Sequence, residues 1–535
     1  MTDIKNRRLS LKFIIGILWI TFIVLGICRD LKFFYFDGVY NSNSILFYCL
    51  MKCIFILIII GISIWLYKFI INYSIKKKLF LQKIKFVVPF LIIYGLLLIV
   101  LWPGNWGVVG DEFQVYMSVK NLRVWPDQGL LSSVFMILSL MVYPSPGIIC
   151  LLQGLISALL VGNILYMFHE EFKNRKVTVF LGILLVSFPA LTYVFCPIRA
   201  WLYSVLLLYF IESIYFFFRK KKYNKSSIWK LTFCCALIVN YRSEGMILLL
   251  LYPIALFVCA DFIENKKKTI VNQILLIIFS IILVKGLTII GNGQTLRQHS
   301  GIGLVCPLSI VLADDIRYGK IDEMDIHNIN QVFDIETLRK YPSKTVAWQG
   351  KSRERDYDEP TKEEMASFMK SATKILINNW PIYLECKWEA MKSSLGIYPY
   401  FRTIWPAWTF DTLSSWRENG GKDIPGEVLE DFRVIDENEA RIVVSSLLIS
   451  PMVISGIDLF YLLYAFWLPC LFMFIYLVVA IARKRWWEAV FAFGLVIQFL
   501  LVVFTAPCQY QMYYLAFYFC GWYLLTRLIA ERKKR

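Results

Sequence analysis

Residues 231–262 read LTFCCALIVNYRSEGMILLLLYPIALFVCADF, which is two apolar runs joined by the polar turn at 240–245. Basic clusters flank these runs at residues 219–230 and 266–268. Lys and Arg gather on the cytoplasmic side of helical membrane proteins, so both ends of the segment are expected on that side. The chain must then cross the membrane an even number of times between the clusters. This predicts a hairpin of two short or tilted spans whose turn faces outward.

The rest of the chain shares this apolar character. Of its 535 residues, 58% are hydrophobic, and the mean hydropathy is +0.58. Apolar runs recur from end to end, so we expect an all-α polytopic membrane protein. The net charge of +18 resides largely in short clusters between the runs, where Lys and Arg set the orientation and contact membrane lipids. Nucleic acid is therefore not an expected partner.

The same even-number rule, applied to every basic cluster, predicts about twelve transmembrane helices with both termini cytoplasmic, in the cell (plasma or inner) membrane. The first apolar run lacks a cleavage site and is interpreted as a retained signal anchor. The short run 130–143 cannot cross without breaking the rule, so we expect a surface-lying or re-entrant helix there. The expected spans are residues 13–28, 46–72, 86–102, 146–168, 177–196, 201–218, 231–243, 245–262, 269–290, 457–482, 487–506 and 511–530.

This count divides the chain into three parts. Residues 1–290 form an N-terminal transmembrane module with an outward loop at 103–129. Residues 291–440 are the one sizeable soluble portion, and the charged stretches 321–340 and 361–374 have helical patterns, so a small, mainly helical extracytoplasmic domain is expected. Residues 441–535 return to the membrane as the C-terminal helices.

Two adjacent carboxylates, Asp111 and Glu112, follow the expected span 86–102, after the sequence WPGNWGVVG. They open an amphipathic stretch, so Asp111 can simply cap a helix while Glu112 favours its positive end. Alternatively, one carboxylate is a general base for an acceptor hydroxyl, or helps to hold a divalent cation such as Mg²⁺ or Mn²⁺. A base is needed at a membrane surface only if its substrate is borne by a lipid.

Arg199 and Arg242 are expected on the same outward side as the acid pair. A guanidinium at a helix end is well suited to grip a phosphate in bidentate fashion. The alternative is a snorkelling arginine, or a local pair such as Arg242 with Glu244. Gln114, Trp125, Gln509 and Tyr510 are weaker candidates for contact with an acceptor or a sugar, and the aromatic run 398–408 is either a sugar-stacking surface or an interfacial belt.

Together these pieces resemble the GT-C class of membrane glycosyltransferases, and more closely a group of bacterial polytopic proteins associated with surface polysaccharide synthesis. The matching pieces are WPGNWGVVGD at 102–111, LQG at 152–154, RSEG at 242–245, CPLSIVLA at 306–313 and NWPIYL at 379–384. Two positions depart from the pattern. Trp125-Pro-Asp-Gln128 stands where a His-Pro often follows the acidic motif, and Gln509-Tyr510 stands where an Arg-Tyr pair often precedes the last span.

The resemblance implies that Asp111, with Glu112 second, is the catalytic base or metal ligand, and that Arg242 holds the phosphate of a polyprenyl-phosphate-linked sugar. The expected function is transfer of that sugar to an extracytoplasmic glycan or lipid-linked acceptor. Two alternatives stay open: a transporter or flippase for a lipid-linked saccharide, and a non-catalytic partner in polysaccharide assembly. A transporter would be expected to show polar groups at mid-membrane and a repeat relating its halves.

Overall fold

The fold was analysed in a computed structural model of the whole chain. The structure describes residues 2–35, 42–71, 73–106, 111–125, 129–197, 199–220, 225–259, 262–263, 265–291, 297–313, 321–346, 360–397, 431–432, 439–449, 453–454, 457–458 and 463–534. Within these residues the chain is helical, apart from one pair of two-residue antiparallel strands, β1 (Val453–Ile454) and β2 (Ile457–Asp458). The expected aromatic run 398–408 lies outside the described residues.

Among the described residues, six helices are long and apolar enough to cross a membrane, so the chain is a helical membrane protein. The outer helices bury little of their surface against other helices. Only 11% of the most apolar stretch of α12 is buried, so its exposed isoleucines and leucines are available to contact lipid. The six helices are α2 (Ser42–Ile71), α3 (Tyr73–Leu101), α6 (Pro146–Phe172), α9 (Arg199–Lys220), α12 (Lys266–Ile290) and α23 (Trp486–Thr505).

The other expected spans coincide with helices that are shorter, broken or more polar. The segment 177–196 is divided at Val186 into two helices, and the segment 457–482 is helical only from Trp467 in its described part. The number of twelve spans therefore stays a prediction. These remaining helices are α1 (Thr2–Phe33), α7 (Arg175–Leu185), α8 (Phe188–Tyr193), α10 (Lys225–Tyr241), η2 (Ser243–Ile247), α11 (Leu248–Cys259), α22 (Trp467–Ala482), η9 (Gln511–Tyr514) and α24 (Leu515–Lys534).

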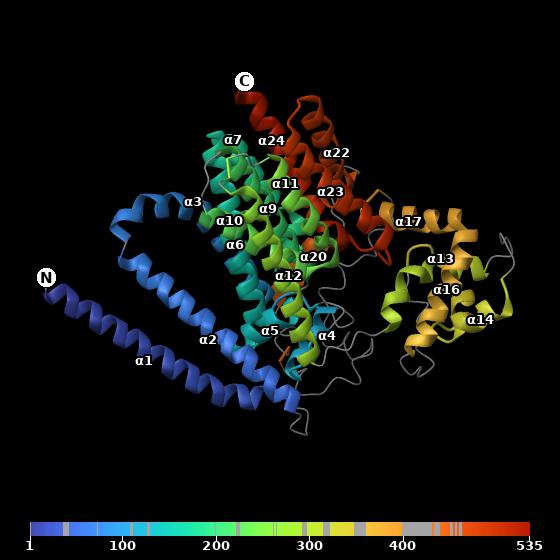
Figure 1. Ribbon diagram of the computed structural model, residues 1–535, viewed down its shortest axis with the longest axis horizontal. Helices are drawn as coiled ribbons and strands as arrows, with labels where there is room; N and C mark the ends of the chain where they lie inside the picture. Colours follow the sequence, from blue (N-terminus) through green and yellow to red (C-terminus); the bar gives the residue numbers. More distant parts are fainter. Residues whose placement is uncertain are drawn as a thin grey trace.

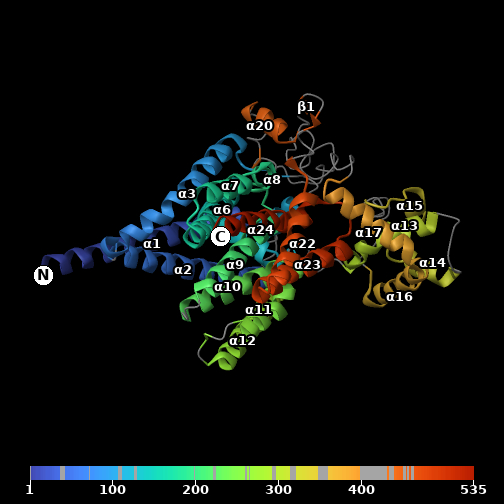
Figure 2. The same cartoon turned by 90° about the horizontal axis from the view of Figure 1, so that it is seen from above.

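The helices form a bundle from which the α1–α2 hairpin projects to one side, while a lobe of short helices lies on the other (Figures 1 and 2). Helix α6 packs against α3 and α9, and α24 packs against α22 and α9. The α22–α24 contact is unusually close, because a Cβ added at Gly521 would lie 1.9 Å from the carbonyl oxygen of Pro469. Only glycine fits at that position.

Helix α5 (Leu130–Val142) occupies the short apolar run for which a surface or re-entrant helix was expected. It does not lie on the surface of the bundle. It packs against α2, α6, α10 and α12 as well as α4 (Asp111–Lys120), and both Ser133 and Ile137 are fully buried. A short helix is stable at this depth because neighbouring protein, rather than lipid, surrounds it.

The lobe consists of helices from the long segment between α12 and the C-terminal helices (Figure 1). The charged stretches expected to be helical do form helices, and Thr361 and Glu364 cap one of them reciprocally. The boundaries 291 and 440 stay predictions. The lobe helices are η3 (Arg297–Leu304), α13 (Val305–Ala313), α14 (Glu323–Asn330), α15 (Ile335–Lys340), α16 (Lys362–Asn378) and α17 (Trp380–Ser394).

The lobe is attached to the bundle at the turn that follows α23. The buried Lys387 of α17 donates to the carbonyl oxygens of Gly303 (3.2 Å) and Ala506 (2.8 Å). Burial lowers the pKa of Lys387, since an ammonium is disfavoured away from water. The backbone N–H of Gln509 donates to Thr345 at 3.0 Å. One turn therefore carries contacts to both the lobe and the bundle.

A buried ionic network joins the helices at the end of the bundle where the basic clusters lie, which we call the basic end. Arg527 of α24 is fully buried and donates to both oxygens of Glu171 (2.7 and 3.0 Å), with Glu212 at 3.5 Å. Glu531 pairs with Arg219 at 3.1 Å and also with Arg485. These residues come from α6, α9, α24 and the start of α23, so the network fixes which ends of the helices lie together.

Replacing Arg527 with methionine tests the network. The change leaves two buried carboxylates without their shared cation, so we expect a loss of about 3–5 kcal/mol in the free energy of unfolding. Denaturant unfolding in mixed micelles, followed by tryptophan fluorescence, measures this loss. The matched control is Arg532→Met, an exposed arginine on the same helix, for which the change is expected within about 0.5 kcal/mol. Equal unfolding midpoints for the two variants would contradict the assignment.

The expected orientation can be tested by cysteine labelling of intact cells. Gln114 is exposed on α4 and is expected to face outward, whereas Lys267 is exposed at the start of α12 and is expected to face the cytoplasm. A membrane-impermeant maleimide should label Gln114→Cys in intact cells and Lys267→Cys only after permeabilisation, above the background of the parent chain. The reverse pattern would invert the topology, and labelling of both from outside would refute it.

Candidate functional site

Helix α4 begins at Asp111, in agreement with the amphipathic stretch predicted there. The side chain of Asp111 lies outside the part of the chain that the structure describes. Glu112 points into the protein and is only 1% exposed, with its Oε1 accepting from the Cys196 thiol at 3.8 Å. The Cys150 thiol and the Tyr193 hydroxyl are near enough to interact electrostatically with the Glu112 carboxylate. Glu112, at the second position of α4, is therefore enclosed by protein.

The segment before α4 is fixed from several directions. The buried Arg441 of α20 (Glu439–Ile449) donates from Nη1 to the carbonyl oxygens of Leu101 and Gly104, both at 2.7 Å. Asn105 donates to Thr192 at 2.8 Å. Gly104 has φ of 120°, and a Cβ there would lie 2.2 Å from the sulfur of Cys150, so glycine is required. These contacts place the start of α4 against α6 and the α8–α9 turn.

The other face of α4 is held by the long segment between the lobe and α20. The Asp431 carboxylate accepts hydrogen bonds from Tyr116 (2.8 Å) and from Lys120 (2.9 Å). The Phe432 ring packs edge-on against the Trp106 ring, with 5.2 Å between the ring centroids. Lys120 is itself buried against the rings of Phe33 and Tyr35. Residues far apart in sequence thus enclose the helix that carries the acid pair.

The predicted basic group forms a real cluster in the turn between α10 and α11. Arg242 donates from Nε (3.1 Å) and Nη2 (2.5 Å) to the two carboxylate oxygens of Glu244, and both residues are buried. Burial alone would raise the pKa of Glu244, but Arg242, and then Arg199, outweigh it and hold this pKa at about 2. The alternative of a local Arg242–Glu244 pair is therefore what the structure contains, and Arg199 lies beside it.

Two aromatic rings lie close to the Arg242 guanidinium. The rings of Tyr203 on α9 and Tyr513 in η9 both lie 5.6 Å from its central carbon. Its Nη1 makes no hydrogen bond within the described part of the chain, whereas Nε and Nη2 are used by Glu244. Arg242 therefore keeps donors for a further anionic acceptor while being held rigidly by the carboxylate and the rings.

The weaker sequence candidates separate into two groups. Tyr510 is buried with its ring 5.9 Å from that of Tyr513, so the Gln509–Tyr510 turn adjoins the Arg242 cluster. Gln114 is exposed on the opposite side of α4 from the enclosed acid, and the backbone N–H of Trp125 donates to Ser133 at the start of α5. The structure therefore brings Gln509 and Tyr510 to the basic group, and it places Gln114 on the exposed face of α4. Trp125 contacts the start of α5, which lies next to Tyr241, the residue before Arg242.

Among the described residues, no three His, Cys, Asp or Glu side chains lie close enough together to hold a metal ion. The described groups around Glu112 are the thiols of Cys150 and Cys196 and the phenol of Tyr193. Mg²⁺ instead prefers oxygen ligands in near-octahedral geometry. The surroundings of Glu112 thus do not fit that ion, and no chemical step is assigned to a metal.

Sequence reasoning missed the buried acids of the basic end. Glu171, Glu212, Glu488 and Glu531 each lie in or beside an apolar run, and each pairs with an arginine. Asp30 and Lys52 form a further buried pair, at 2.5 Å, between α1 and α2. An acidic residue inside an apolar run is costly unless paired, so this signal could have predicted that these acids are paired, although not with which partners.

Comparison of the chain with models of protein families, with curated proteins and with solved structures found no match.

The stability of single and double variants tests whether Arg242 and Glu244 act as a pair. Arg242→Met leaves the Glu244 carboxylate buried without its main partner and should cost about 3–5 kcal/mol of unfolding free energy. Arg242→Met/Glu244→Met removes both charges and should be more stable than the single variant. Denaturant unfolding in micelles measures both. A double variant as unstable as the single one would show that the pair does not act as a unit.

Proposed function

We propose that the protein is a membrane glycosyltransferase that moves a sugar from a polyprenyl-phosphate-linked donor to an extracytoplasmic glycan or lipid-linked acceptor. The observation that supports this most is the Arg242 cluster. A buried guanidinium with unused donors, a second arginine beside it and aromatic walls form a suitable grip for a phosphate at a helix turn. The sequence resemblance to GT-C enzymes supplies the reaction class.

In this proposal Asp111 is the base and Glu112 is a positioning residue. Glu112 is enclosed beside Cys196, so an acceptor hydroxyl has no access to it without displacement of protein. Asp111 is the other member of the acid pair and is therefore assigned the role of the base. Asp111 at the first position of α4 also benefits from the positive end of the helix, which stabilises the carboxylate form that a base requires.

The transfer itself forms one bond and breaks one. Asp111 takes the proton of the acceptor hydroxyl, whose oxygen attacks the anomeric carbon of the donor sugar, and the bond from that carbon to the phosphate oxygen breaks. The polyprenyl phosphate leaves with the additional negative charge, which Arg242 and Arg199 stabilise. Inversion at the anomeric carbon is implied by the resemblance alone.

The test is mass analysis of surface glycans and lipid-linked intermediates from deletion cells that are complemented with variants at matched membrane abundance. Asp111→Asn is expected to behave like the deletion, with one sugar missing and the unmodified acceptor accumulating. The matched control is Glu323→Gln, the same change from carboxyl to amide at an exposed position on α14, which should restore the full glycan.

If Asp111→Asn restores the full glycan, Asp111 is not the catalytic base. That result would favour a role in transport or in polysaccharide assembly. The double variant Arg242→Met/Glu244→Met gives a second check, because it is expected to fold and yet to transfer no sugar. Normal transfer by this variant would remove the phosphate role of the cluster.

A further inference from the structure

A cavity of about 630 Å³ lies at the basic end, between α3, α6, α9 and α10. Four lysines line it: Lys83, Lys220, Lys225 and Lys230. No acidic residue is among its lining residues, although glutamates are frequent at this end of the bundle. A cavity with this lining has a strongly positive potential, and its size is within the range of small-ligand sites.

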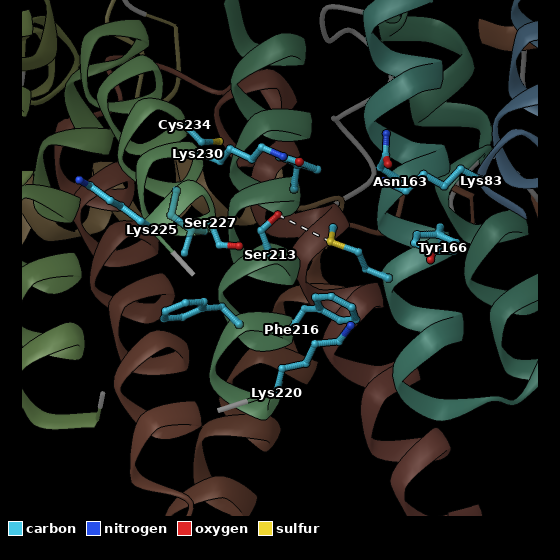
Figure 3. Close-up of a pocket in the computed structure, with 14 residues that line it drawn as sticks. Lys83, Asn163, Tyr166, Ser213, Phe216, Lys220, Lys225, Ser227, Lys230 and Cys234 are labelled. Atoms are coloured by element: carbon cyan, nitrogen blue, oxygen red, sulfur yellow. Dashed lines mark hydrogen bonds between the residues drawn. The ribbon is translucent and has the colours of Figure 1, made fainter. Parts of the chain in front are cut away.

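The lysines approach the cavity from different helices (Figure 3). Lys83 comes from α3, Lys220 from the end of α9, and Lys225 and Lys230 from the first turns of α10. Lys83 and Lys230 are close enough to repel each other. None of the four ammonium groups has a carboxylate within 4 Å in the described part of the chain. In the described residues, then, no carboxylate pairs with these lysines, in contrast to the paired arginines nearby.

Neutral hydrogen-bonding groups and apolar side chains complete the walls. Asn163, Tyr166, Ser213 and Ser227 supply polar atoms, and the ring of Tyr166 lies 5.3 Å from the Lys83 ammonium. The apolar part includes Met167, Phe216, Phe217 and Leu231. A ligand with an anionic head and an apolar body fits this division better than a fully polar ion does.

The surface beside the cavity faces lipid. On α10, Trp229 is 46% exposed and Phe233 is 63% exposed, and both flank the lining residues Lys230 and Cys234. Tryptophan at the level of the lysines is typical of the membrane–water interface. This pattern is the one expected where the ammonium groups lie at the level of the lipid headgroups and exposed apolar surface continues along α10.

A neighbouring cavity at the same end of the bundle has a different lining. The space of about 890 Å³ between α3, α6 and α7 also contains basic side chains, Lys85 and Arg175. Glu170 lies in the same lining, and the walls are mostly apolar. Basic residues at this membrane level therefore do not by themselves produce an acid-free cavity.

We propose that the cavity lined by Lys83, Lys220, Lys225 and Lys230 binds the headgroup of an anionic phospholipid that carries two phosphate groups. Two phosphodiester groups carry two negative charges and so offset half of the charge of the four lysines, and basic pockets between transmembrane helices are suited to such headgroups. The acyl chains lie along the exposed apolar surface of α10. This site is at the opposite end of the bundle from the Arg242 cluster, and the proposal does not depend on the transferase assignment.

Native mass spectrometry of the full-length protein, delipidated in detergent and titrated with diphosphatidylglycerol, tests the proposal. Lys83→Gln/Lys230→Gln is expected to weaken binding on the order of 30-fold, from the contribution of a lysine to anionic-lipid binding. The matched control is Lys267→Gln/Lys268→Gln, which removes the same charge from exposed positions at the start of α12. Control and parent should bind equally, and equal weakening by both pairs would overturn the site.

Two further arms exclude a misfolded variant and a different ligand. Lys83→Arg/Lys230→Arg preserves the charge and should retain binding, so loss in this variant also counts against the proposal. Inorganic diphosphate should compete at least tenfold more weakly than the lipid, because it lacks the apolar chains. Equal competition would show a site for a soluble phosphate anion, and equal binding of phosphatidylcholine would show that charge plays no part.

Discussion

The contact of Arg527 with Glu171 and Glu212 determines the arrangement of the bundle. Its members are deeply buried, so each charge depends on the others for compensation. The three residues lie on α24, α6 and α9, and their pairing fixes the axial register of these helices. Helix α9 is about 33 Å long, and Arg199 begins it at the far end. A constraint at the basic end therefore positions the candidate site across the membrane.

The candidate site is built from segments that have no common sequence neighbourhood. Arg441 contacts the residues before α4, Asp431 contacts the side of α4, and Arg242 lies close to the rings of Tyr203 and Tyr513. The turn after α23 belongs to the same region, because it joins the lobe through Lys387 and continues into Tyr510. The turn after α23 thus contacts both the lobe and the Arg242 cluster.

The sequence was informative where contact with lipid or water imposes a pattern on the residues of a helix. Apolar length and basic clusters predicted helices at the membrane level, and charge periodicity predicted the lobe helices, because both depend on local composition. The turn at Arg242 was found for the same reason. The direction of Glu112, the enclosure of α5 and the partners of Glu171 and Glu212 could not be found, since each depends on which distant segments pack together. Local pairing of Arg242 with Glu244 was foreseen as an alternative because the two residues are adjacent in the turn.

The close contact at Gly521 has a consequence for the history of the gene. Every other amino acid adds a Cβ, which the carbonyl of Pro469 excludes, so each missense change at this codon acts on folding before it acts on function. Gly61, Gly95 and Gly286 face open space and are free to vary among descendants of the same ancestor. Sequence drift should therefore be uneven among the glycines, and it should be slowest where two helices leave no room for a methyl group.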